Sequence, residues 1–183
     1  MCGFHRSLML ALAIGLLGAM PAAAQEKKDP AYPETADGLK SQIADLYRAT
    51  KDGDKKKGAE LAKALALPKH EAWFQEIFGE EKGTKLAADY GKQLPKLEGD
   101  IGQLFAKAVK AAQSEFQVLR FEKAPDPKAV GAQNDALTAM KKPVPLYSVR
   151  FVKPGEKLGV HIYSFAYADG GFRLVGKLQG LRN

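Results

Sequence analysis

The stretch LGVHIYSFAYADGGFRLVGKL, residues 158–178, decides the fold, because it contains two strand patterns on either side of a turn. Residues 158–167 and 172–178 are rich in β-branched and aromatic side chains, and the segment 168–171, Ala-Asp-Gly-Gly, has the composition of a tight turn. Upstream, residues 146–152 form a third strand pattern, and the turn residues Pro-Gly-Glu-Lys at 154–157 join it to the next strand. These patterns predict an antiparallel meander.

A fourth strand is predicted ahead of the meander. Residues 116–121, FQVLRF, place apolar side chains on both sides of a strand, and Ala-Pro-Asp-Pro at 124–127 ends it. Residues 125–143 form the longest irregular region, and a weak helical pattern from Ala129 to Met140 predicts a loop with a short helix in it.

The first half of the chain has the period of helices. The spacing of Leu39, Ile43 and Leu46 predicts a helix over residues 36–51, with Thr35 or Asp37 at its start. After the break at 52–54, Asp-Gly-Asp, a second helix is expected, with Asp54 as its N-cap and with Leu-Pro at 67–68 as its end.

Two further helical patterns follow. Pro68 suits the first turn of a third helix, which Gly79 ends. From Glu81 to Ala112 an apolar stripe continues at helical spacing, but Pro95 interrupts it. A proline inside a helix removes a hydrogen bond and clashes with the preceding turn, so we expect either a kink or two helices that meet at residues 93–95.

Together these elements predict an α+β fold, in which N-terminal helices pack on a four-stranded, mainly antiparallel curved sheet formed by the C-terminal half. The order of helices, one strand, a crossover and a three-stranded meander resembles the nuclear transport factor two-like superfamily, also called the cystatin-like cone. The final hairpin, residues 158–178, carries most of this resemblance. The resemblance implies a pocket between the concave sheet face and the helices, and in some members a histidine that transfers protons with an aspartate or tyrosine.

The N-terminus predicts export. Residues 1–24 have a basic start, an apolar run from Leu8 to Met20 and a small-residue end at Ala24, which is the pattern of a cleaved signal peptide. The apolar run is shorter than the roughly 20 residues of a membrane-spanning helix, so a retained anchor is the alternative we do not favour. Residues 25–34 are expected to be a flexible leader and residues 35–183 a single domain, located in the periplasm or outside the cell.

Composition limits the chemistry. Cleavage would remove Cys2, the only cysteine, so the mature chain would have neither a disulfide nor a thiolate ligand. His70 and His161 are the only histidines beyond the signal, and we expect no metal and no cofactor. The formal net charge of +7 is spread along the chain without a nucleic-acid-reading motif, so we expect no nucleic-acid partner and at most a peripheral membrane contact.

Two clusters of side chains are candidate sites. His161 lies in a strand pattern that also places Tyr163, Phe165 and Tyr167 at alternating positions, so all four are expected on one side of the strand. His161, Tyr163 and Arg150 are therefore candidate catalytic residues, and Tyr47 and Tyr147 are further companions. The alternative is a histidine that lies beside aromatic rings without a chemical role.

The second cluster lies on the predicted third helix. His70, Trp73 and Phe74 are one turn apart and would suit the mouth of a site for a flat apolar ligand, to which Tyr147 and Phe165 would contribute. The alternative is that this cluster packs a helix onto the sheet.

Three functions are compatible with these features. The first is a non-catalytic module that binds a small apolar ligand or an envelope protein. The second is a structural or assembly role in which the sheet face is buried in a homodimer. The third is a small isomerase-like or hydrolase-like enzyme that uses His161 as its proton carrier.

Overall fold

The computed structural model describes residues 32–181 and has the predicted α+β architecture. The helices are α1 (Ala36–Lys51), α2 (Lys55–Ala64), α3 (His70–Phe78), α4 (Glu80–Lys110) and α5 (Gly131–Ala139), followed near the C-terminus by the short 3₁₀ helix η1 (Gln179–Leu181). The strands are β1 (Glu115–Phe121), β2 (Leu146–Val152), β3 (Gly159–Ala168) and β4 (Gly171–Leu174). The predicted signal peptide and most of the predicted leader lie outside the described residues. No described helix is both long enough and apolar enough to span a membrane.

Local side-chain chemistry sets the helix ends. The Thr35 hydroxyl accepts a hydrogen bond from the Gly38 backbone N–H at 3.0 Å and caps α1. The Asp54 carboxylate accepts one from the Lys57 backbone N–H at 2.9 Å and caps α2 in the same way. Gly79, with φ 81°, ends α3 in a conformation that glycine adopts without strain. The predicted start and end of the first helix are confirmed.

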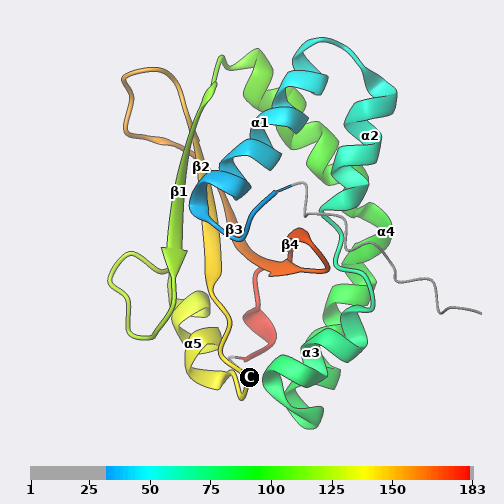
Figure 1. The fold of residues 1–183 in the computed structure, drawn as a ribbon, viewed down its shortest axis with the longest axis vertical. Helices are drawn as coiled ribbons and strands as arrows, with labels where there is room; N and C mark the ends of the chain where they lie inside the picture. Colours follow the sequence, from blue (N-terminus) through cyan, green and yellow to red (C-terminus); the bar gives the residue numbers. More distant parts are fainter. Residues whose placement is uncertain (1–31, 182–183) are drawn as a thin grey trace, which may run out of the picture.

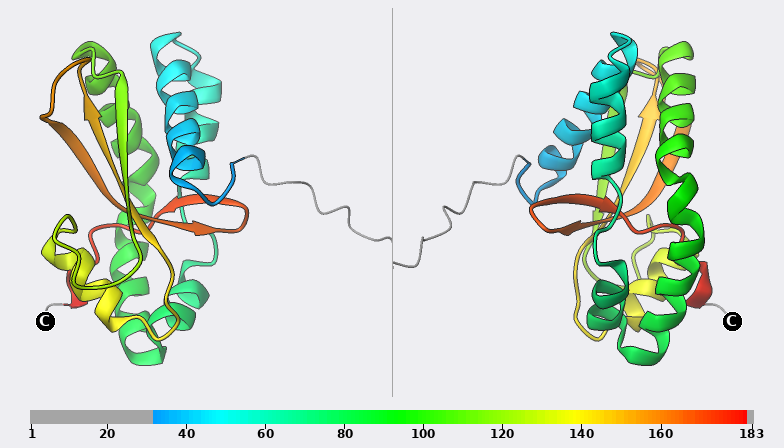
Figure 2. Two further views of the ribbon diagram at one scale, coloured as in Figure 1. Left: turned by 60° about the vertical axis from the view of Figure 1, so that its left-hand side comes forward. Right: turned by 90° about the vertical axis from the view of Figure 1, so that its right-hand side faces the viewer.

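Helix α4 is one continuous helix of 31 residues, so of the two alternatives expected at Pro95, a kink or a division into two helices, the division is wrong. Pro95 lies on the exposed side of α4, where water can hydrogen-bond the Gly91 carbonyl that loses its backbone partner. Figure 2 shows α4 running the height of the molecule, with α2 beside its upper part and α3 beside its lower part.

The four strands form an open antiparallel sheet in the order β1-β2-β3-β4 (Figure 1). Val149 of β2 pairs with Val118 of β1 and with Ile162 of β3, which fixes the register. Strand β4 ends at Leu174, earlier than the predicted end at Leu178. The Leu174 backbone N–H donates to the Leu65 carbonyl at 2.8 Å instead of continuing a strand ladder, and Gly176 then turns the chain with φ 82°.

A bulge in β3 changes the side on which its aromatic residues lie. Ser164 has φ 62° and is inserted between Tyr163, which pairs with Ser148, and Phe165, which pairs with Tyr147. Because Ser148 and Tyr147 point to opposite faces of β2, their partners also lie on opposite faces. The prediction that His161, Tyr163, Phe165 and Tyr167 share one side is therefore wrong.

Two hydrophobic clusters form the interior. The first lies between α1, the C-terminal half of α4 and one face of the sheet, and includes Leu39, Ile43, Phe105, Tyr147, Phe151, Phe165 and Phe172. The second lies between α3, the N-terminal half of α4, α5 and the other face of the sheet, and includes Phe74, Phe78, Leu86, Phe121, Leu146 and Ala166. Leu97 of α4 packs against both clusters.

Buried polar groups fix the last hairpin against α1. The Gln42 side chain accepts from the Phe172 backbone N–H at 3.0 Å and donates to the Phe172 carbonyl at 3.2 Å. Both contacts are buried, so this amide replaces a strand partner for β4. The hairpin β3–β4 consequently turns across the molecule toward α1 (Figure 1).

Candidate functional site

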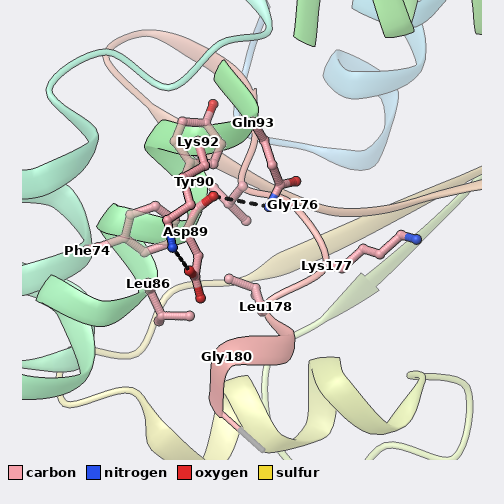
Figure 3. Close-up of a pocket in the computed structure, with 11 residues that line it drawn as sticks. Phe74, Leu86, Asp89, Tyr90, Lys92, Gln93, Gly176, Lys177, Leu178 and Gly180 are labelled. Atoms are coloured by element: carbon pink, nitrogen blue, oxygen red, sulfur yellow. Dashed lines mark hydrogen bonds and ion pairs between the residues drawn. The ribbon is translucent and has the colours of Figure 1, made fainter. Parts of the chain in front are cut away.

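A partly enclosed groove, which we call the α4–β3 groove, lies between the middle of α4, the first half of β3 and the chain that follows β4. It consists of a hollow of about 220 Å³ and an adjoining one of about 470 Å³. The two hollows share Tyr90, Gln93, Gly176 and Lys177. Figure 3 shows the larger hollow between α4 and the segment that leads to η1.

The groove exists because β4 covers only part of β3. Strand β4 pairs with residues 165–168 of β3, and residues 159–163 pair with β2 alone. After Leu174 the chain leaves the sheet, and the Val175 N–H donates to the Ser164 carbonyl at 2.8 Å. The first half of β3 therefore has an edge without a neighbouring strand, and α4 passes beside it (Figure 2).

Apolar side chains from three elements line the smaller hollow. Leu94, Leu97 and Leu104 come from α4, Ile162 from β3 and Leu174 from β4. Leu94, Leu97 and Leu104 are half-buried, so they keep surface that no other side chain covers. The larger hollow adds Phe74, Leu86, Val175 and Leu178 to this lining.

His161 and Tyr163 line the polar end of the groove, and Arg150 contacts His161. Arg150 pairs across the strands with His161, and its Nε–H donates to His161 Nε2. The other ring nitrogen of His161, Nδ1, lies 3.0 Å from the Tyr163 hydroxyl. Arg150 also donates from Nη1 to the Lys157 carbonyl at 3.1 Å, which orients its guanidinium. The three candidate catalytic residues are thus brought together.

These contacts determine the state of the imidazole. Burial lowers the pKa of His161, and the positive charge of Arg150 lowers it further. A neutral ring whose Nε2 accepts a hydrogen bond carries its proton on Nδ1, so His161 donates to Tyr163. With both nitrogens engaged, the ring has no lone pair left to take a proton from a bound molecule.

Of the candidate ligand-binding residues on α3, only Phe74 lines the groove. Phe74 is buried, lines the larger hollow and lies 5.6 Å, between ring centroids, from Tyr90. His70 packs against Tyr90 at 5.3 Å between ring centroids, and Trp73 packs edge-on against Phe74 at 5.1 Å. Neither His70 nor Trp73 lines a hollow of the groove, so both support its wall from behind.

Tyr90 is the central residue of that wall. Its hydroxyl accepts a hydrogen bond from the Leu67 backbone N–H at 2.8 Å, and burial raises its pKa. Beside it, Asp89 pairs with Lys92 at 3.0 Å, and the Gln93 amide donates to the Asp89 carbonyl at 3.2 Å (Figure 3). These contacts hold the polar rim of the larger hollow in place.

Tyr147 and Phe165 lie away from the groove. Both are fully buried in the first cluster, where Tyr147 packs edge-on against Phe172 at 5.0 Å between centroids. Tyr47 packs against Phe116 at 5.3 Å in the same cluster. These side chains fill the sheet face that packs on α1, so they do not join His161.

The sequence patterns had pointed to few of the apolar groove residues. Leu94, Leu97 and Leu104 belong to the apolar stripe predicted from Glu81 to Ala112, but helical spacing does not distinguish a covered stripe from a partly open one. Lys177 and Gln93 gave no signal at all, since their role depends on the path of the chain after β4.

Residues 32–181 contain no group of three histidine, cysteine, aspartate or glutamate side chains that would hold a metal ion. Comparison of the chain with family models, curated proteins and solved structures finds no match. The candidate function therefore depends on the geometry of the groove, and the resemblance to the nuclear transport factor two-like superfamily stays a prediction.

Proposed function

We propose that the protein is a non-catalytic module that binds a small, largely apolar molecule in the α4–β3 groove. The observation that carries this proposal is the open hollow lined by Leu94, Leu97 and Leu104 on one side and by Ile162 and Leu174 on the other. Ligand sites in proteins are concave, mostly apolar and supplied with a few placed polar groups, as this groove is.

The state of His161 favours binding over catalysis. A general base needs a free lone pair within reach of the proton that it takes. Nε2 of His161 accepts from Arg150, and Nδ1 donates to Tyr163, so the ring serves to orient its neighbours. This arrangement supports the binding proposal and weakens the proposal of an enzyme that uses His161 as its proton carrier.

Export through residues 1–24 belongs to the same proposal. A small apolar molecule is poorly soluble in water, and a carrier outside the cytoplasm would keep it dispersed. The ligand would then be taken up and released without covalent change, which requires no cofactor.

A titration with the uncharged fluorophore N-phenylnaphthylamine tests the proposal, because its emission rises in an apolar site. We expect saturable binding to the purified protein, weakened about tenfold or more by Gln93→Trp, which places an indole between the two hollows. Gln93 is exposed, so the fold tolerates the change.

Lys96→Trp is the matched control, since Lys96 is exposed on the same helix and lines neither hollow. It should bind the fluorophore as the unmodified protein does. Equal binding by the Gln93→Trp and Lys96→Trp variants would refute the proposed site. Native mass spectrometry of the same samples reports any retained ligand and the number of subunits.

A further inference from the structure

The contacts of Arg150, His161 and Tyr163 form a chain of hydrogen bonds with one direction. Arg150 is a donor only, so it donates to His161 Nε2, and the ring proton on Nδ1 is then donated to the Tyr163 oxygen. The Tyr163 hydroxyl therefore accepts within the chain, and its own proton is directed to a further acceptor.

The described part of the protein supplies no such acceptor. Among residues 32–181, the Tyr163 hydroxyl has no hydrogen-bond partner besides His161. A cation at the start of a hydrogen-bond chain polarises each following donor, so the Tyr163 O–H is a stronger donor than an isolated tyrosine. Tyr163 lines the smaller hollow, so a bound molecule is the natural acceptor.

The charges around the groove favour an anionic acceptor. In the described residues, neither Arg150 nor Lys177 lies within ion-pair distance of a carboxylate. Lys177 is exposed and lines both hollows. The acidic side chain in the groove wall, Asp89, is already paired with Lys92. A carboxylate would therefore enter a positive environment, whereas an ammonium group would be repelled.

We infer that the α4–β3 groove binds amphiphilic carboxylates, with the head group on the Tyr163 hydroxyl near Lys177 and the apolar chain along Leu94, Leu97 and Leu104. This inference rests on the proposed function and adds the chemistry of the head group to it. Tyr163 is the residue that determines specificity, and Arg150 and His161 are positioning residues that act through it.

Isothermal titration calorimetry with three ligands that share one tail tests the inference. Decanoate, decanol and decylammonium differ only in the head group, so differences in affinity report the polar end of the groove. We expect the purified protein to bind decanoate about tenfold or more tightly than decanol, and decylammonium most weakly, because a hydrogen bond to a charged group is among the stronger ones.

Two variants locate the preference. Tyr163→Phe should lose most of the preference for decanoate, while its affinity for decanol falls only slightly, because the hydrogen bond to a neutral hydroxyl is the weaker one. Arg150→Met should reduce the preference in the same direction, since it removes the cation at the start of the chain. Tyr167→Phe is the control, because Tyr167 lines neither hollow. Its hydroxyl instead donates to the Tyr32 carbonyl at 3.0 Å. This variant should keep the full preference.

The outcomes separate the two proposals. Equal affinity for decanoate and decanol in the unmodified protein would overturn the head-group inference and leave apolar binding standing. An undiminished preference for decanoate in Tyr163→Phe would also overturn it. If none of the three ligands bound, the proposed function itself would fail, and this inference with it.

Discussion

The face of the sheet that packs on α1 and its edge beside α4 are built from similar residue types and differ in how completely they are covered. On the α1 side, Tyr147, Phe151 and Phe165 are 0% exposed. At the β3 edge, Leu97 and Leu104 of α4 stay partly exposed around an open hollow. The free edge of β3 therefore leaves an open hollow, whereas the sheet face beside α1 is filled by side chains.

Helix α4 contributes to both regions. Ile101 and Phe105 point into the first cluster and are buried, and Phe105 packs edge-on against Phe151 at 5.1 Å between centroids. Leu104 is adjacent to Phe105 in the sequence, yet it lines the groove. Residues next to one another on a helix point in different directions, so one helix builds both the core and the groove wall.

The largest expected effect is on the free energy of unfolding and tests how closely the sheet face beside α1 is packed. Phe151→Ala removes a ring that packs against Phe105 and against Phe116, the latter at 5.2 Å. Because these surroundings cannot close the cavity completely, the free energy of unfolding should fall by about 3–5 kcal/mol. Urea unfolding followed by circular dichroism measures it.

Leu158→Ala is the matched control for an exposed apolar residue. Leu158 is 83% exposed on the β2–β3 loop, so its truncation should change the free energy of unfolding by no more than about 0.5 kcal/mol. Similar losses for Phe151→Ala and Leu158→Ala would mean that the face is not packed as described.

The next effect compares two glycines of α4. A Cβ at Gly83 would lie 2.5 Å from the Phe74 carbonyl oxygen and 2.6 Å from the Gln75 backbone nitrogen, so α3 and α4 touch there without space. Gly83→Ala should therefore lower the free energy of unfolding by about 1–3 kcal/mol.

Gly99 lies on the same helix, and a Cβ there would meet nothing within 4 Å. Gly99→Ala should raise the free energy of unfolding by about 0.5–1 kcal/mol, because alanine loses less backbone entropy in a helix. Thermal unfolding of both variants checks the pair, and a stabilised Gly83→Ala protein would contradict the close contact of α3 with α4.

The smallest effect is a pH dependence at the groove. The pKa of His161 is lowered in the folded state by burial and by Arg150, so the unfolded chain binds a proton more readily. The contribution of His161 to stability is therefore complete above its unfolded pKa of about 6.5 and is lost as the pH falls through its lower folded pKa.

Unfolding midpoints of the unmodified protein and of His161→Gln, measured at about pH 7.5 and about pH 5, test this dependence. Glutamine does not titrate, so the variant should lose less stability on acidification than the unmodified protein. An equal or larger loss in His161→Gln would show that the folded state does not disfavour the protonated ring.

The parts of the fold that depend on neighbouring residues were predictable. The bounds of α1, the Asp54 cap, the end of α3 at Gly79 and strand β2 agree with the sequence patterns. Each depends on a cap, a breaker or a period that acts over a few residues, so the sequence alone reveals it.

The parts of the fold that depend on contacts between distant residues could not be predicted from the sequence. The Ser164 bulge moves Phe165 to the opposite face, and no turn signal in the sequence marks it. The early end of β4 depends on a hydrogen bond from Leu174 to Leu65, more than a hundred residues away. His161, Tyr163 and Arg150 were candidates from the sequence, and the contacts that join them come from the pairing of β2 with β3, which leaves Phe165 and Tyr147 on the other face.

By itself, the sequence determined the α+β class, the helix caps and the antiparallel meander, because short-range propensities and side-chain periods specify them. Only the tertiary structure decided which surfaces are filled and which stay open. The reason is that burial depends on what packs against a stripe. Phe105 and Leu97 both belong to the apolar stripe of α4, but Phe105 is completely covered, whereas Leu97 packs against both clusters and still lines the open hollow.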